Sequence, residues 1–109
     1  MVRLTVELDA ASPRRLADLL EGLRFLMTST RLEPGCLGCS AWSDADSKTH
    51  YVEEWQTEAD IRRRVRSPEF TSLLAIMESA REPPRVQFDF VTRTRGLDYV
   101  AEVRGEILR

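Results

Sequence analysis

The segment from residue 33 to residue 56 contains two candidate strands separated by a polar stretch, and the second of them is rich in β-branched and aromatic residues. Near its start lies Pro34-Gly35, a turn dipeptide that ends the preceding secondary-structure element. Residues 36–42 and 49–55 have the pattern of strands. The Asp and Ser side chains of residues 43–48 favour a turn, because they hydrogen-bond their own backbone. The segment therefore predicts a β-hairpin with an exposed polar tip, around which the rest of the chain must build a sheet.

Three further segments alternate apolar and polar residues, as half-buried strands do. Residues 2–8 and 86–92 alternate clearly, and both are predicted as strands. Residues 97–103, which follow Gly96, alternate less clearly, because Val100 interrupts the polar side and Ala101 has low β-propensity. We predict a tail strand over about 97–103.

Helix starts are marked by Ser12-Pro13, by Thr57 with Asp60, and by Ser67-Pro68. A Ser or Thr at the N-cap accepts a hydrogen bond from an otherwise unpaired backbone N–H. Pro has no backbone N–H, which costs nothing at the first helical position, because an N–H there would have no partner within the helix. The first helix carries leucines at helical spacing and is predicted to reach about residue 30. The second is predicted to end at residue 66, and the third before residues 83–84.

The predicted order β-α-β-β-α-β is the split βαβ or ferredoxin-like arrangement, an α+β fold. Both long helices would cover one face of the sheet, so the other face must be solvated or covered. Trp42, Val52 and Val91 place apolar area on that other face, together with His50. We therefore predict a homodimer, in which the tail strand can cross to the second copy.

The chain has 109 residues and a net charge of −2, and we predict one domain over residues 1–109. This charge argues against a nucleic-acid partner, because nucleic-acid-binding domains usually carry a basic excess. No apolar run approaches the length of a membrane span, and the first residues lack a signal-peptide pattern. We expect a cytoplasmic protein with no membrane partner, in which both cysteines are free thiols.

Three motifs together resemble the antibiotic biosynthesis monooxygenase (ABM) domain family: Glu33-Pro34-Gly35-Cys36, Tyr51-Val52-Glu53-Glu54-Trp55 and Ser67-Pro68-x-Phe70. The resemblance implies a ferredoxin-like sandwich that forms a dimeric α+β barrel, with a pocket between sheet and helices. It also implies a quinol monooxygenase-like activity, in which molecular oxygen oxidises quinols or polycyclic phenols without metal, flavin or haem. There the deprotonated substrate gives an electron to oxygen, so the protein supplies a base and a shaped apolar cavity.

This chain departs from the family pattern at one position of the expected pocket. Many relatives carry a His nine residues after the Trp, and counting from Trp55 reaches Arg64. An arginine stays protonated and is a poor base, although it can hold an anion. Haem-degrading relatives need a histidine ligand on this helix and an Asn in the first strand, and this sequence has neither. No haem, other cofactor or metal is therefore expected.

The resemblance assigns the catalytic roles to Arg64, which would hold the phenolate, and to Glu53, which would orient Arg64. It assigns substrate binding to Trp55, Tyr51, Phe70, Leu74 and Met77. Each assignment has a structural alternative, in which Glu53 and Arg64 form an ion pair that ties the hairpin to the helix and the aromatic and apolar residues are core.

His50 and the two cysteines are further candidates that the strand pattern argues against. Alternation places His50 on the face opposite Trp55, toward the predicted dimer contact. Cys36 and Cys39 have the spacing of a redox-active or zinc-binding cysteine pair. On a strand this odd spacing predicts that the two side chains point to opposite faces, and the sequence has no second ligand pair for zinc. We predict no mutual disulfide and a role as small buried residues.

Two functions follow from these patterns. The leading hypothesis is a cofactor-independent monooxygenase that oxidises a small aromatic quinol or phenol. The alternative is a non-catalytic small-molecule-binding or accessory protein on the same dimeric scaffold, in which loss of the family histidine marks loss of the chemistry.

Overall fold

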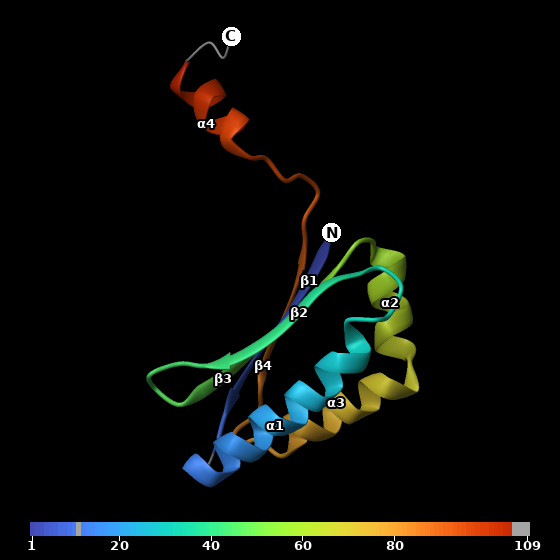
Figure 1. Ribbon diagram of the computed structural model, residues 1–109, viewed down its shortest axis with the longest axis vertical. Coiled ribbons are helices and arrows are strands. Elements are labelled where there is room, and N and C mark those ends of the chain that lie inside the picture. The colour runs from blue at the N-terminus through green and yellow to red at the C-terminus, as the bar shows by residue number, and fades with distance from the viewer. Residues whose placement is uncertain (11, 106–109) are drawn as a thin grey trace.

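A four-stranded antiparallel sheet is the centre of the fold, which the computed structural model describes for residues 1–10 and 12–105 (Figure 1). The strand order is β2-β3-β1-β4, with bounds β1 (Val2–Asp9), β2 (Cys36–Ser43), β3 (Lys48–Trp55) and β4 (Arg85–Phe90). Three helices lie together on one side of the sheet: α1 (Pro13–Thr30), α2 (Glu58–Arg66) and α3 (Pro68–Glu78). The predicted α+β, ferredoxin-like fold is confirmed.

The helices begin at the residues that the capping signals predict. The Ser12 side chain accepts a hydrogen bond from the backbone of Arg15, and Ser67 accepts one from Phe70. Thr57 and Asp60 form the reciprocal capping box at the start of α2. Each cap satisfies backbone donors that would otherwise be unpaired, so the start of each helix is determined locally.

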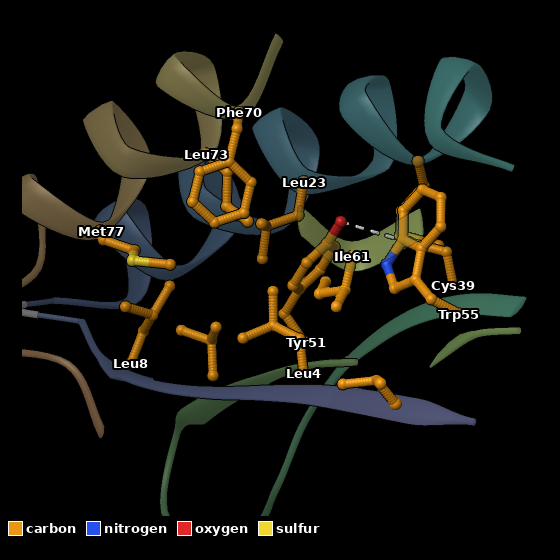
Figure 2. Close-up of a cluster of buried hydrophobic side chains, with 13 residues drawn as sticks. Leu4, Leu8, Leu23, Cys39, Tyr51, Trp55, Ile61, Phe70, Leu73 and Met77 are labelled. Carbon is orange, nitrogen blue, oxygen red and sulfur yellow. Dashed lines mark hydrogen bonds between the residues drawn. The ribbon is translucent and has the colours of Figure 1, made fainter. Parts of the chain in front are cut away.

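The core lies between the helices and the inner face of the sheet, which we define as the face that α1–α3 cover. Alternate residues of β1 and β3 supply its floor, and Leu23 of α1 with Leu73 of α3 closes it from above (Figure 2). Each large apolar side chain buried in this way stabilises the fold by about 1.5–3 kcal/mol. The floor residues are Val2, Leu4, Val6, Leu8, Tyr51 and Trp55.

A β-bulge in β2 overturns the prediction that the two cysteines point to opposite faces. Cys36 pairs with Trp55 and Cys39 pairs with Glu53, and the register shifts between residues 36 and 38. Residues paired across two strands share a face, so both cysteines lie on the inner face. In a regular strand, residues three positions apart point to opposite faces. The extra residue of the bulge brings Cys36 and Cys39 to the same face.

The tail after β4 also differs from the sequence prediction. Residues 97–103 were expected to form a strand, but α4 (Leu97–Arg104) is a helix that ends at Gly105, whose φ of 73° suits a left-handed C-cap. Leu97, Val100 and Ala101 recur at helical spacing, which the weak alternation concealed. A helix pairs its own backbone groups, whereas a strand needs a neighbour, and Figure 1 shows α4 standing clear of the sheet.

The outer face of the sheet, opposite the helices, carries the sole histidine. His50 pairs with Trp42 across β2 and β3, and the two rings stack with centroids 5.3 Å apart. Nε2 of His50 lies 2.7 Å from Oδ2 of Asp44 at the hairpin tip. The predicted placement of His50 away from Trp55 is confirmed.

Across the described residues, no helix combines the length and the apolar character needed to span a membrane.

Candidate functional site

Glu53 and Arg64 form a bidentate ion pair beneath the helices. Glu53 points inward because it has the same strand parity as Tyr51 and Trp55, and Arg64 lies on the side of α2 that faces the sheet. Nε of Arg64 donates to Oε1 of Glu53 at 3.1 Å, and Nη2 donates to Oε2 at 2.9 Å. Both side chains are buried, with exposed fractions of 0% and 3%. The contact that the nine-residue spacing from Trp55 predicts is present.

Two neighbouring donors complete the hydrogen bonding of the Glu53 carboxylate. The hydroxyl of Tyr51 donates to Oε2, and the indole Nε1 of Trp55 donates to Oε1 at 2.9 Å. Together with Arg64 these make four accepted hydrogen bonds, which fill the lone-pair positions of a carboxylate. Glu53 is therefore a fixed anion that orients its neighbours, and it has no vacant position from which to take a proton.

The other polar groups around the pair keep their protons at neutral pH. Burial, followed by the charge of Glu53, raises the pKa of Tyr51 well above its usual value. Burial likewise raises the pKa of the Cys39 thiol to about 11, and this thiol donates to the Tyr51 oxygen at 3.3 Å. Burial works to lower the pKa of Arg64, but the hydrogen bonds and the charge of Glu53 outweigh it and the pKa is raised. These groups can donate and orient, but none of the three is a base at neutral pH.

One nitrogen of Arg64 lacks a hydrogen bond among the described residues. Nη1 has as its nearest anion Oε2 of Glu33, at 3.7 Å, which is too long for a hydrogen bond. Glu33 lies between α1 and β2, and its side chain is 28% exposed. The Phe70 ring lies on another side of the guanidinium, with its centroid 5.5 Å from Cζ. Nη1 is therefore the point at which the buried pair faces a partly solvated carboxylate.

Only some of the predicted binding residues lie around the ion pair. Tyr51 and Trp55 contact Glu53 directly and Phe70 contacts Arg64, and all three are buried. Met77 is buried at the opposite end of the core cluster from Trp55 (Figure 2). Leu74 does not join the group, because it lies on the exposed side of α3 and Leu73 takes the buried position. The side chains fill the space around the ion pair, so a ligand would have to displace some of them.

A groove of about 270 Å³ lies between α2 and β4, and neither Glu53 nor Arg64 lines it. Its apolar lining comes from α2 and β4: Ile61, Val65, Phe88 and Phe90. Among the described residues, no three His, Cys, Asp or Glu side chains are grouped so that they could hold a metal ion.

Sequence patterns did not assign three residues that contact the site. Thr30 accepts a hydrogen bond from Nη2 of Arg64 at 3.2 Å, Cys39 contacts Tyr51, and Glu33 faces Nη1. Glu33 belongs to the motif that carried the family resemblance, so a signal for it was present. Thr30 is the last residue of α1, and its contact depends on how the helix packs. Cys39 reaches the inner face only through the bulge.

Comparisons with known proteins give a family match over the elements that carry Glu53 and Arg64. The family model described as "Antibiotic biosynthesis monooxygenase" matches residues 1–75, which include β1 through α2 and most of α3. A comparison with curated proteins gives no match.

Solved structures show the same fold at low sequence identity. A protein from Deinococcus radiodurans assigned to the antibiotic biosynthesis monooxygenases has a TM-score of 0.77 and 19% identity, over 88% of this chain and 97% of its own. A Mycobacterium tuberculosis protein has a TM-score of 0.74 and 18% identity, over 87% and 98%. A Bacteroides thetaiotaomicron protein has a TM-score of 0.71 and 16% identity, over 81% and 94%. At these identities the likeness shows the shared fold alone.

Proposed function

This chain belongs to the antibiotic biosynthesis monooxygenase family, and on that premise we propose that it is a cofactor-independent monooxygenase acting on a small aromatic quinol or phenol. One observation supports the proposal most. Glu53 fixes the guanidinium of Arg64 through two of its nitrogens, and Nη1 is left without a hydrogen bond among the described residues. A guanidinium that is held in place and has one nitrogen free to donate suits the binding of an oxyanion. The guanidinium does not have to reorient when the ligand binds.

In this proposal Arg64 and Glu53 are the catalytic pair. The phenolate oxygen of the substrate takes the position near Nη1 that the Glu33 carboxylate approaches at 3.7 Å. Glu53 holds the guanidinium in place, and the rings of Trp55 and Phe70 would contact the aromatic body of the substrate. Tyr51 and Met77 remain candidates for substrate contact, whereas Leu74 would require a substrate that extends to the exposed side of α3.

In this proposal the substrate binds as its anion. Glu53 has its lone pairs occupied, and Tyr51 and Cys39 stay protonated, so none of these three takes the proton of the substrate. The anion then transfers one electron to oxygen, and the resulting substrate radical and superoxide combine through a new carbon–oxygen bond. Protonation of the peroxide and cleavage of its O–O bond release water and leave a carbonyl on the attacked carbon, which loses its one hydrogen, while the hydroxyl of the phenol has lost the other. Four electrons leave the substrate, and each oxygen atom of O₂ is accounted for.

Affinity for a phenol should follow the ionisation of the phenol itself. We expect 4-nitrophenol to bind the wild-type protein more tightly as the pH rises through its own pKa, because Arg64 stays cationic throughout. Its methyl ether, 4-nitroanisole, has the same body and no charge, so its affinity should not change with pH. Isothermal calorimetry at several pH values measures both ligands. Equal affinity for the two at every pH would contradict a role for Arg64 in holding the anion.

The alternative function, a binding or accessory protein without catalysis, is favoured by a specific observation. Arg64 and Glu53 are themselves buried and the Glu53 carboxylate is fully hydrogen-bonded, as expected for a structural ion pair. In that case a phenolate could still bind at Nη1, and no oxygen would be consumed. The two functions therefore agree on binding and differ on turnover.

We also propose that the protein is a cytoplasmic homodimer. Trp42, which is half-exposed on the outer face, and its neighbour Val52 offer apolar area for a second copy packed sheet on sheet. Cys36 and Cys39 are free thiols, which fits a reducing compartment. Sedimentation of the full chain at micromolar concentration is the check on the dimer.

A further inference from the structure

The inner side of β4 carries a row of apolar residues that the helices leave uncovered. Val86, Phe88 and Phe90 alternate along the strand and pair with Val6, Leu4 and Val2 of β1, so they point to the same side as the core. Unlike those β1 residues, they are 40–56% exposed. Phe88 and Phe90 continue into the groove along α2, where Ile61 and Val65 form the facing wall. We call Val86, Phe88, Phe90, Ile61 and Val65 the β4 groove.

Helix α4 presents a second uncovered apolar surface. Leu97, Val100 and Val103 lie on one side of the helix, and each is at least half exposed. The opposite side is polar, because Arg95 bridges Asp98 and Glu102 there. The chain leaves the sheet after β4 and carries α4 away from the body (Figure 1). The radius of gyration, 16.9 Å, exceeds the value of about 13 Å for a compact chain of this length.

We propose that α4 of one copy docks in the β4 groove of a second copy, and that the contact is reciprocal. The dimensions agree, because the eight residues of α4 extend about 12 Å and the four steps from Val86 to Phe90 extend about 13 Å. Exchange of the two arms covers both uncovered surfaces of each chain at once. Such a reciprocal contact is the form that a two-fold dimer requires.

Charge at the ends of the two surfaces is also complementary. Asp98 and Glu102 share the single guanidinium of Arg95, so these three side chains carry one negative charge in excess, and Arg104 follows at the end of the helix. At the groove, Arg62 is paired with Glu58, and Arg66 has no ion-pair partner among the described residues. A docked α4 would bring its excess carboxylate toward this arginine. Docking also places the partner's helix against α2, the element that carries Arg64.

The inference rests on the proposed dimer, and one set of sedimentation measurements separates the two ideas. The wild type should be a dimer at micromolar concentration, and Val100→Asp on α4 and Phe88→Asp in the groove should each weaken it at least about tenfold, because each buries a carboxylate in an apolar contact. Phe25→Asp, at a residue of α1 that is 81% exposed, is the matched control and should leave the dimer unchanged. A mixture of Val100→Asp and Phe88→Asp retains one intact contact and should recover part of the affinity.

The outcomes distinguish the failure of each claim. A monomeric wild type would overturn both the dimer and the arm exchange. A dimer that survives both Val100→Asp and Phe88→Asp but is lost in Val52→Asp, on the outer face, would overturn the α4 exchange alone.

A disulfide test covers the case in which an aspartate variant fails to fold. Val100→Cys and Phe88→Cys, mixed as separate proteins and oxidised, should give a covalently linked pair, whereas Val100→Cys with Phe25→Cys should not. Equal yields from both mixtures would overturn the exchange. So would a monomeric double variant that links within its own chain, because that result means that α4 folds back on its own groove.

Discussion

Replacing Arg64 by alanine is expected to lower the free energy of unfolding by about 3–5 kcal/mol. The substitution leaves the Glu53 carboxylate buried with 0% exposure, and its remaining donors, Tyr51 and Trp55, are neutral. The hydroxyl of Thr30 loses a donor at the same time. Urea unfolding followed by fluorescence measures the change.

Arg62→Ala is the matched control for this substitution. Arg62 lies on the same helix and also forms an ion pair, with Glu58, but both side chains are more than half exposed. Exposed pairs of this type contribute little, so a change of at most about 0.5 kcal/mol is expected. If Arg64→Ala and Arg62→Ala destabilise the protein equally, the Arg64–Glu53 pair does not hold the hairpin to α2 as the geometry indicates.

Gly35→Ala should destabilise the protein by about 2–4 kcal/mol, through backbone strain and loss of a helix cap. Gly35 has a φ of 86°, a conformation that alanine adopts only with strain, and a methyl group there would lie 2.3 Å from Cγ of Asp60. Asp60 is the capping-box residue of α2, so relief of the clash would break the cap with Thr57. Because α2 carries Arg64, the site would shift as well.

Gly38→Ala provides the control, because it makes the same change three residues away. A methyl group at Gly38 would have no heavy atom within 4 Å outside its immediate chain neighbours, and the residue does not require a positive φ. We expect a change of at most about 0.5 kcal/mol. Thermal unfolding of the two variants under the same conditions checks the difference, and equal melting temperatures would contradict the clash with Asp60.

Local patterns in the sequence were sufficient to predict the fold, and the family resemblance was needed to select Arg64. Strand alternation placed Glu53 and Trp55 on one face, and the capping box set the start of α2, whereas the family pattern pointed to the residue nine positions after Trp55. Both signals depend on backbone geometry over a few residues, which sequence periodicity reflects directly.

The predictions that failed depended on tertiary context. One extra residue in β2 turned both cysteines inward. Gly38 is a residue at which a bulge is common, but a glycine in a strand does not by itself determine whether the register shifts. The tail segment contains strand and helix periodicities together, and the absence of a neighbouring strand in the described chain favours the helix. On α3 the choice between Leu73 and Leu74 for the buried position depends on how the helix is rotated against α1.

Oxygen consumption by the purified wild-type protein with a panel of hydroquinones and anthrones tests the proposed chemistry most directly. We expect turnover with at least one member of the panel, without added flavin, haem or metal, and with one atom of ¹⁸O₂ in the product and the other in water. Turnover should rise with pH through the pKa of the substrate, and Arg64→Lys should reduce it, because lysine cannot maintain the two-point contact with Glu53. The opposite result is a protein that binds phenolates in a pH-dependent manner, yet consumes no oxygen above the uncatalysed rate with any substrate of the panel. That result would contradict the monooxygenase and favour the binding protein.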